Sequence, residues 1–344
     1  MEKADIKSWN QTELKEFLVS LGEQPFRAKQ VYSWLHVKHA ETFEEMTDIS
    51  KKLKDKLTNT CELAVLHKEK VQCSQVDGTR KYLFSLADGN MVESVLMHYR
   101  HGDSVCISSQ VGCRMGCQFC ASALGGLVRN LTPAEMLEQV YQIQKDSGRR
   151  VSHVVVMGMG EPLDNYGNLL KFIRMISDGN GLNISQRNLT ISTCGIVPNI
   201  YHLAEEGLQV TLALSLHAPS QEKRLLLMPV AKKYGVIQVV EACRHYVQQT
   251  GRRITFEYSL VAGANDGEAD ARQLAGLIRG INCHVNLIPV NPVKGRGFVP
   301  PSRQATLNFK NKLEKYGINV TIRREMGQDI DGACGQLRRR FSER

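Results

Sequence analysis

From residue 105 onward the chain repeats one pattern, in which a short apolar stretch is followed by a stretch with the spacing of an amphipathic helix. The apolar stretches are residues 105–107, 151–157, 189–193, 210–216, 254–261, 285–288 and 318–322. Short buried strands that alternate with helices are typical of a parallel β-sheet built from βα units. About six repeats are present, fewer than the eight of a complete barrel. We therefore predict an α/β fold, a partial (β/α)6-type barrel over residues 100–330.

The first sixty residues have a different pattern. Residues 12–21, 25–34 and 49–57 have the spacing of short amphipathic helices, and the third is rich in lysine. Its lysines are Lys51, Lys52, Lys54 and Lys56. They fit an RNA-binding face and an ordinary solvated helix face equally well. We predict that residues 1–60 form a helical, basic, RNA-binding accessory domain.

Between these helices and the repeated pattern lies a segment with β-strand character. Residues 80–84 and 91–96 read as strands, and the turn signals Asp77-Gly78 and Asp88-Gly89-Asn90 precede them. We predict a β-rich extension over residues 61–99. Together with the helices before it, this extension makes a small N-terminal α+β accessory domain.

The composition bounds the class of protein. A chain of 344 residues with 42% hydrophobic residues is long enough to bury a large core. No run of eighteen apolar residues is present, and the first residues lack the basic-then-apolar order of a signal peptide, so we expect a cytoplasmic protein without a membrane partner. The ten cysteines are then expected to be reduced. Lys and Arg outnumber Asp and Glu by 44 to 35, and the net charge of +9 favours a polyanionic partner.

Three cysteines, Cys113, Cys117 and Cys120, lie in the loop that follows the first predicted barrel strand. Thr132-Pro133-Ala134-Glu135 marks the start of the next helix, with a capping box and a proline at the first helical position. A structural zinc site needs four ligands, usually as two pairs, and a disulfide leaves one thiol over. An iron–sulfur cluster normally takes four thiolates, so three leave one iron without a protein ligand. S-Adenosylmethionine (SAM) together with such a cluster is a route to radical chemistry.

Polar groups also follow several other predicted strands, where the chemistry of parallel α/β folds is found. The candidate contacts for a cofactor are Gly160, Glu161, Ser192, Ser215, Leu216, His217 and Asn291. Gly160 permits a close backbone approach, and the Glu161 carboxylate can accept hydrogen bonds from an ammonium group. Taken singly, His217 reads equally as a structural histidine, and a serine at a strand end reads equally as a helix cap.

The cysteine loop resembles that of the radical SAM superfamily, and the whole chain resembles the RlmN/Cfr family of RNA adenine methylsynthases. The motifs that carry this resemblance are CISSQVGCRMGCQFC, GMGEPLDN, SLHAP, LMPV and DIDGACGQLRRR. The resemblance implies a radical SAM barrel and a [4Fe-4S] cluster held by Cys113, Cys117 and Cys120. SAM caps the fourth iron, and two SAM molecules are consumed per turnover. Pro162 with Asp164-Asn165 is similar to the branch that methylates C2 of adenine, whereas the C8 branch typically has alanine after the glutamate.

The resemblance also implies roles for three further residues. Cys334 takes a methyl group from one SAM, loses a hydrogen to a 5'-deoxyadenosyl radical from the second, and adds to C2. Glu93 removes the C2 proton, and Cys106 resolves the covalent protein–RNA adduct through a transient disulfide. Without the family, Cys106 reads as a small buried residue and Glu93 as a solvated strand residue. We assign residues 331–344 to a C-terminal loop with the catalytic cysteine and a basic tail.

The implied substrates are 23S ribosomal RNA at the peptidyl-transferase centre and an anticodon-loop adenosine of transfer RNA. A target base has to leave its stack to enter the barrel mouth. Candidate phosphate contacts are Arg323, Arg324, Arg338, Arg339 and Arg340. An electron donor such as flavodoxin or ferredoxin is implied, and we expect a monomer. The alternatives are a C8 methyltransferase of the Cfr type and a non-catalytic iron–sulfur RNA-binding or redox-sensing protein.

Overall fold

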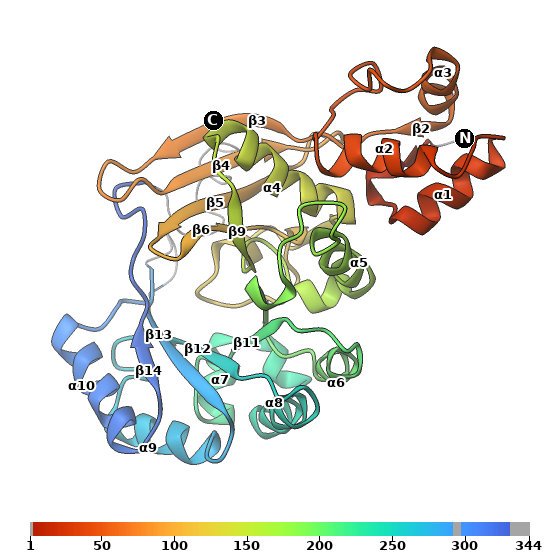
Figure 1. Ribbon diagram of the computed structural model, residues 1–344. Coiled ribbons are helices and arrows are strands. Elements are labelled where there is room, and N and C mark those ends of the chain that lie inside the picture. The colour runs from red at the N-terminus through yellow and green to blue at the C-terminus, as the bar shows by residue number, and fades with distance from the viewer. Residues whose placement is uncertain (1–2, 292–296, 331–344) are drawn as a thin grey trace.

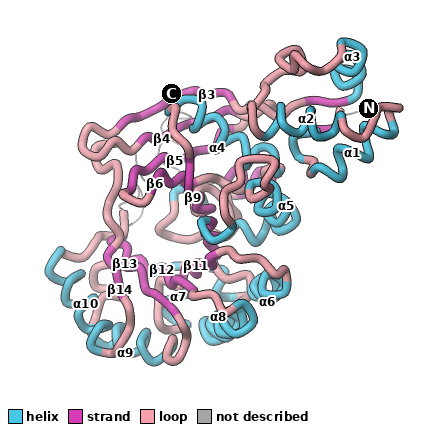
Figure 2. The backbone as a smooth tube through the Cα atoms, in the orientation of Figure 1, coloured by secondary structure: helices cyan, strands magenta, loops and turns pink. Residues whose placement is uncertain are grey.

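The computed structural model describes residues 3–291 and 297–330 of the chain (Figure 1). Its centre is a sheet of ten strands within the described residues, and Figure 2 shows its strands in magenta. From one edge to the other the strands are β14 (Val320–Ile322), β13 (Cys283–Pro289), β12 (Ile254–Leu260), β11 (Thr211–Ser215), β10 (Leu189–Thr193), β9 (Val151–Val156), β6 (Gly102–Cys106), β5 (Met91–Tyr99), β4 (Arg80–Ser85) and β3 (His67–Cys73).

The strands from β6 to β14 in this sheet run parallel to one another. The helices that connect them are α4 (Pro133–Ser147), α5 (Tyr166–Ile176), α6 (Val197–Glu205), α7 (Gln221–Leu227), α8 (Val236–Thr250), α9 (Glu268–Leu277) and α10 (Arg303–Lys315). Six strands are each followed by helix, and β14 completes the set, so the predicted α/β fold with a mostly parallel sheet is confirmed. In the described part of the chain β14 and β3 are the two edges, and the sheet is open.

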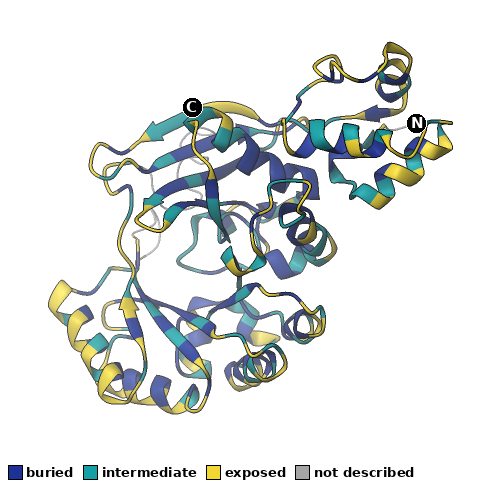
Figure 3. Ribbon diagram, viewed as in Figure 1, coloured by how far each residue is buried: buried dark blue, intermediate teal, exposed yellow. Residues whose placement is uncertain are grey.

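The β-rich segment predicted over residues 61–99 is continuous with this sheet. Strands β3, β4 and β5 form an antiparallel meander, and β5 pairs with β6, the first parallel strand. One hydrophobic core therefore runs from Tyr82 and Phe84 on β4 to Phe309 on α10. Figure 3 shows this interior in dark blue between the sheet and its helices.

The N-terminal helices form a unit with its own core beside the barrel (Figure 1). It contains α1 (Gln11–Ser20), α2 (Arg27–His36), α3 (Lys51–Thr60) and a short parallel pair, β1 (Ala4–Asp5) and β2 (Cys61–Glu62). Two of the four lysines of α3 bind within this unit, because Lys54 donates to the carbonyl of Glu44 and Lys56 to the carboxylate of Glu23. Lys51 and Lys52 are exposed.

The cysteine loop is framed by a second, two-stranded sheet of β7 (Gln110–Gly112) and β8 (Leu127–Asn130). The helix after it begins as predicted. Thr132 caps α4 by accepting a hydrogen bond from the Glu135 N–H, the Glu135 carboxylate accepts one from the Thr132 N–H, and Pro133 is the first helical residue. The loop with the three cysteines is thereby placed at the carboxyl end of β6.

Candidate functional site

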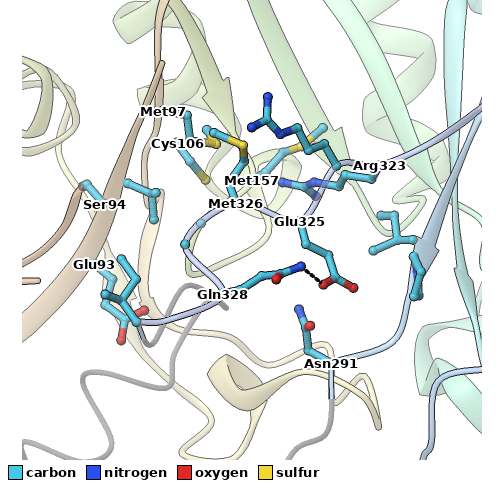
Figure 4. Close-up of a pocket in the computed structure, with 17 residues that line it drawn as sticks. Glu93, Ser94, Met97, Cys106, Met157, Asn291, Arg323, Glu325, Met326 and Gln328 are labelled. Atoms are coloured by element: carbon cyan, nitrogen blue, oxygen red, sulfur yellow. Dashed lines mark hydrogen bonds between the residues drawn. The ribbon is translucent and has the colours of Figure 1, made fainter. Parts of the chain in front are cut away.

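A cavity of about 380 Å³ opens at the carboxyl edge of the parallel strands, between the end of β6 and the segment that follows β14 (Figure 4). Its lining residues are Glu93, Ser94, Val95, Met97, Cys106, Met157, Gly158, Ile288, Pro289, Asn291, Arg323, Arg324, Glu325, Met326, Gly327, Gln328 and Ile330. Two predicted catalytic residues, Glu93 and Cys106, share this wall, and so do the predicted phosphate contacts Arg323 and Arg324. The strand register explains why Glu93 and Cys106 lie close together. Strand β5 pairs with β6 through Val95 and Cys106, and Glu93 is two residues before Val95 on β5.

Glu93 is buried rather than solvated. Its side chain is 2% exposed, and Oε2 lies 2.9 Å from Nζ of Lys81, whose side chain is fully buried. Lys81 comes from β4, where it sits diagonally across from Glu93, since Leu83 is the direct partner of Glu93. The carboxylate of Glu93 therefore has a cationic partner inside the protein, and a carboxylate is a group that can accept a proton. Sequence reasoning missed Lys81, and the one available signal was a lysine inside an apolar strand.

Cys106 ends β6 and is half-buried, with a free thiol. Burial raises the pKa of the Cys106 thiol, while the charge of Arg323 and a hydrogen bond from the Met157 N–H act to lower it. Figure 4 shows Cys106 in a group of sulfur-containing side chains with Met97, Met157 and Met326. The methionines that surround this thiol were missed from the sequence, because they come from three separated segments.

The three cysteines of the loop occupy a largely apolar pocket of their own. Cys113 and Cys117 are buried and Cys120 is half-buried. The loop is tied at both ends, because the Cys113 N–H donates to Gly126 and the Gln118 N–H donates to Leu227 at the end of α7. Among the described residues, no three His, Cys, Asp or Glu side chains converge on the position of a single metal ion. In an iron–sulfur cube each thiolate binds a different iron atom, so the sulfurs lie farther apart than the ligands of a single metal ion do.

The chemistry of these thiols fits a cationic iron core. Burial raises the pKa of Cys113 to about 12 and raises that of Cys117 as well, and the neighbouring acidic groups add to both effects. Without a metal the thiols therefore stay protonated at neutral pH. A bound cation reverses this balance, since coordinated thiols lose their protons. Three clustered thiols, of which Cys113 and Cys117 are buried and Cys120 is half-buried, suit iron and sulfide.

The GMGEP turn after β9 approaches protein rather than open space. A Cβ on Gly160, whose φ is +106°, would lie 2.6 Å from the Cβ of Gln110. Ser109 and Gln110 donate their backbone N–H groups to the carbonyl of Met159. Glu161 is buried, and its carboxylate accepts hydrogen bonds from the backbone N–H groups of Cys194 and Leu163. Gly160 and Glu161 thus join β6, β9 and β10 directly.

The other predicted cofactor contacts lie at strand ends, as expected. Ser192 on β10 and Ser215 at the end of β11 are half-buried, Leu216 is fully buried, and Asn291 lines the cavity. His217 is buried with φ +56°, and its Nδ1 accepts a 2.9 Å hydrogen bond from the Ser259 N–H.

Burial lowers the pKa of His217 to about 3, so the imidazole is neutral. Its ring packs edge-on against Phe119 of the cysteine loop, with the ring centroids 4.6 Å apart. His217 therefore helps to hold the cysteine loop in place through its contact with Phe119.

Cys334 and the arginines at 338–340 lie outside the described residues. Asp329 lies five residues before Cys334 in the sequence. Its carboxylate is bound to the β3–β4 turn, where it accepts hydrogen bonds from Ser74 Oγ and the Gln75 N–H. No helix in the described parts of the chain is both long enough and apolar enough to cross a bilayer.

Two family descriptions match the chain. Residues 107–275 match the radical SAM superfamily, and residues 4–63 match the ribosomal RNA large subunit methyltransferase N-terminal domain. A crystal structure of a radical SAM methyltransferase from Sphaerobacter thermophilus superposes with a TM-score of 0.92, at 40% identity over 97% of this chain and 98% of that one. The fold and the site thus define an enzyme of the radical SAM class, and this class implies a [4Fe-4S] cluster and SAM.

Curated relatives narrow the class to one family. A probable dual-specificity RNA methyltransferase RlmN from Lachnospira eligens is 60% identical over 98% of this chain and 97% of its own length. Another from Clostridioides difficile is 50% identical over 99% of this chain and all of its own length. The chain belongs to the RlmN family, which confirms the resemblance read from its motifs.

Proposed function

We propose that this enzyme methylates C2 of a specific adenosine in 23S rRNA and in tRNA, through a methylated Cys334 and a covalent protein–RNA intermediate. The observation that carries the proposal is one cavity wall that holds both a charge-paired carboxylate, Glu93, and a free thiol, Cys106. It opens at the strand edge where the three-cysteine loop also lies. The printed name of the relatives, dual-specificity RNA methyltransferase, supports the choice of RNA.

The cofactors would supply a methyl group and a radical that removes hydrogen from the methylated side chain. Cys113, Cys117 and Cys120 would hold the cluster, since no other group of three thiols in the described residues comes from one loop. We assign the binding of SAM to the strand ends with Gly160, Glu161, Ser192, Ser215, Leu216 and His217, and to Asn291, which lines the cavity.

The residues of the cavity divide the remaining work between them. Glu93 accepts the proton from C2 of the adduct, whose unpaired electron would pass to the oxidised cluster, and Nζ of Lys81 lies 2.9 Å from this carboxylate. Cys106 then attacks the sulfur of Cys334 as a thiolate, and the product leaves as a disulfide forms between the two cysteines. The exposed guanidinium groups of Arg323 and Arg324 suit contacts to the RNA backbone.

The assignment to C2 rests on Pro162 and Asp164-Asn165, which continue the GMGEP turn. Asp164 accepts hydrogen bonds from Gln110 and Arg114, so this motif braces the first residue after the Cys113 ligand. We expect the enzyme to be a monomer and to act in the cytoplasm, where its RNA substrates occur. We expect a small redox protein such as flavodoxin or ferredoxin to be the electron donor.

Anaerobic reaction of the reconstituted enzyme with rRNA and tRNA fragments tests the proposal, with mass spectrometry of the digested nucleosides. C2-methyladenosine is the expected product, and C8-methyladenosine would move the enzyme to the other branch. Absence of 5'-deoxyadenosine with a loaded cluster would contradict radical chemistry altogether.

Variants of the cysteines assign their roles. Cys334→Ala should keep its cluster and make no methylated RNA, and normal product would exclude Cys334 as the carrier. Cys106→Ala should accumulate a protein–RNA crosslink. The matched control is Cys73→Ala, because Cys73 is an exposed, free cysteine away from the cavity.

A further inference from the structure

Arg224 is the largest side chain that is fully buried in the described residues. It lies on α7, in the segment between the SLHAP and LMPV motifs, and its guanidinium reaches the carboxyl ends of β10 and β11. Its four hydrogen bonds go to backbone carbonyls: Nη2 donates to Cys194 at 2.6 Å and to Ser215, Nε donates to Leu216, and Nη1 donates to Tyr234. This buried cation forms no ion pair with a described carboxylate or carboxyl group.

The groups whose charge would act on Arg224 are thiols. Burial lowers the pKa of Arg224, and the sulfurs of Cys194, Cys117 and Cys243 oppose that effect. Cys194, whose carbonyl accepts the shortest of these hydrogen bonds, packs in one apolar cluster with Cys117 of the loop and Leu227 of α7. An arginine stays charged inside a protein, so its buried charge requires an anion nearby.

Helix α7 also holds the loop mechanically. The carbonyl of Leu227 accepts the Gln118 N–H at 2.8 Å, and Pro229 lies 3.5 Å from the position of a Cβ on Gly116. The helix that carries the buried cation thus contacts the loop between Cys113 and Cys120. Gly195, with φ +102°, packs closely against α8 beside the guanidinium, since a Cβ there would lie 2.8 Å from Cγ1 of Val239 and 3.4 Å from Nη2 of Arg224.

We propose that Arg224 is the built-in counter-charge of the iron–sulfur cluster and raises its reduction potential. Three thiolates outweigh the positive charge of an oxidised [4Fe-4S] core, and the excess negative charge grows by one unit when an electron enters. A fixed cation that is screened from water stabilises the reduced state more than the oxidised state. The electron comes from an external one-electron reductant, and Arg224 neither gives nor takes it. This inference rests on the proposed binding of the cluster by the cysteine loop.

The alternative role for Arg224 is structural, as a fork that ties the ends of β10 and β11 to the chain after α7. Two substitutions distinguish the effect of the positive charge of Arg224 from the effect of its hydrogen bonds to several backbone carbonyls. Arg224→Lys keeps the charge and loses the fork, whereas Arg224→Gln loses the charge and keeps two donors. The matched control is Arg252→Gln, because Arg252 lies before β12 at the opposite edge of the sheet and donates there to Thr211.

The test is a dithionite-mediated redox titration of the reconstituted proteins without substrate, followed by EPR, together with thermal unfolding of the cluster-free proteins. We expect the ratio of reduced to oxidised cluster in Arg224→Gln, at a fixed potential near the wild-type midpoint, to fall at least tenfold, which equals about 59 mV for one electron. Arg224→Lys and Arg252→Gln should titrate within a factor of three of the wild type.

A purely structural role would lower the unfolding temperature of both Arg224 variants and leave both potentials unchanged, and that result would overturn the inference. If Arg224→Gln does not fold, Arg224→Met replaces it as the uncharged variant, and a wild-type potential in that protein contradicts the inference. A wild-type protein that binds no [4Fe-4S] cluster would instead contradict the proposed function.

Discussion

The hydroxyl of Ser74 donates a 2.6 Å hydrogen bond to Asp329, so the β3–β4 turn holds the last described segment of the chain. The same carboxylate accepts the Gln75 N–H at 2.8 Å, and the Gly327 N–H donates to Asp77 at 2.9 Å. Residues 325–328 of this segment line the cavity. The turn therefore fixes one wall of the candidate site, immediately before the loop that contains Cys334.

Asp329→Ala should release this wall. We expect faster amide hydrogen exchange over residues 325–330, measured by mass spectrometry, and unchanged exchange in the parallel strands. Asp55→Ala, at an exposed position on α3, is the control and should leave the segment protected. Equal protection in Asp329→Ala and the wild type would show that the turn does not hold the wall.

The same contact has a defined pH dependence. Hydrogen bonds from Ser74 and the Gln75 N–H lower the pKa of Asp329. Burial acts to raise the pKa of Asp77, but hydrogen bonds from Gly327 and Thr79 outweigh it and bring the value to about 2. A lowered carboxyl pKa gives stability that is present above the unfolded value of about 4 and is lost as the pH falls toward the folded value. The protection should thus persist at pH 5 and disappear between about pH 4 and 2.

A buried ion pair joins the N-terminal unit to the barrel. Nζ of Lys7 lies 2.7 Å from Oε1 of Glu138 on α4, and both side chains are almost fully buried. Lys7→Met leaves the carboxylate buried without its cation and should cost about 3–5 kcal/mol in the free energy of unfolding. Lys171→Met is the control, since the Lys171–Glu13 pair is partly exposed and should contribute about 0–1 kcal/mol.

Denaturation in urea measures both variants. The double variant Lys7→Met with Glu138→Leu should recover much of the loss, because no charge then remains buried. A single Lys7→Met variant as stable as the control would mean that the two units are not held together by this pair.

Gly160 tests how the GMGEP turn is built. Gly160→Ala places a Cβ at φ +106° and 2.6 Å from Gln110, so we expect a loss of roughly 2 kcal/mol or more in the free energy of unfolding. Gly167→Ala is the control, because Gly167 lies in α5 with no atom within 4 Å of the new Cβ. There the substitution should stabilise by about 0.5–1 kcal/mol. A tolerated Gly160→Ala would indicate that the turn moves to fit its ligand.

The sequence predicted the parallel strands well because buried strands are continuous apolar runs that a single chain displays directly. The start of α4 was equally legible, since the capping box of Thr132 and Glu135 is local. Motif resemblance then gave the residues of the site, but not their surroundings.

What the sequence concealed depends on contacts between distant segments. Glu93 reads as a solvated residue in MVESVL, yet it is buried because Lys81 reaches it from the neighbouring strand. The glycines of GMGEP read as space for a ligand, whereas Gly160 makes room for Gln110. Nothing in the local pattern around Arg224 indicates burial, because the carbonyls that receive its donors belong to three other segments.

Arg323 is expected to control the last chemical step through Cys106. Burial raises the pKa of the Cys106 thiol, and the charge of Arg323 is the largest effect that lowers it. Arg323→Gln should therefore raise the thiol pKa, reduce the thiolate fraction at pH 8 and lengthen the lifetime of the protein–RNA crosslink by roughly tenfold for each pKa unit. Raising the pH forms more thiolate, so the difference from the wild type should shrink once the pH exceeds the thiol pKa of the wild type.

Arg324→Gln is the matched control, because Arg324 lines the same cavity and its substitution removes the same charge from the surface that we propose contacts RNA. Crosslink lifetimes are measured by quenching single-turnover reactions into denaturant and separating the adduct by gel electrophoresis. If both variants lengthen the lifetime equally and without pH dependence, Arg323 acts through RNA binding, and the thiolate of Cys106 is set by other groups.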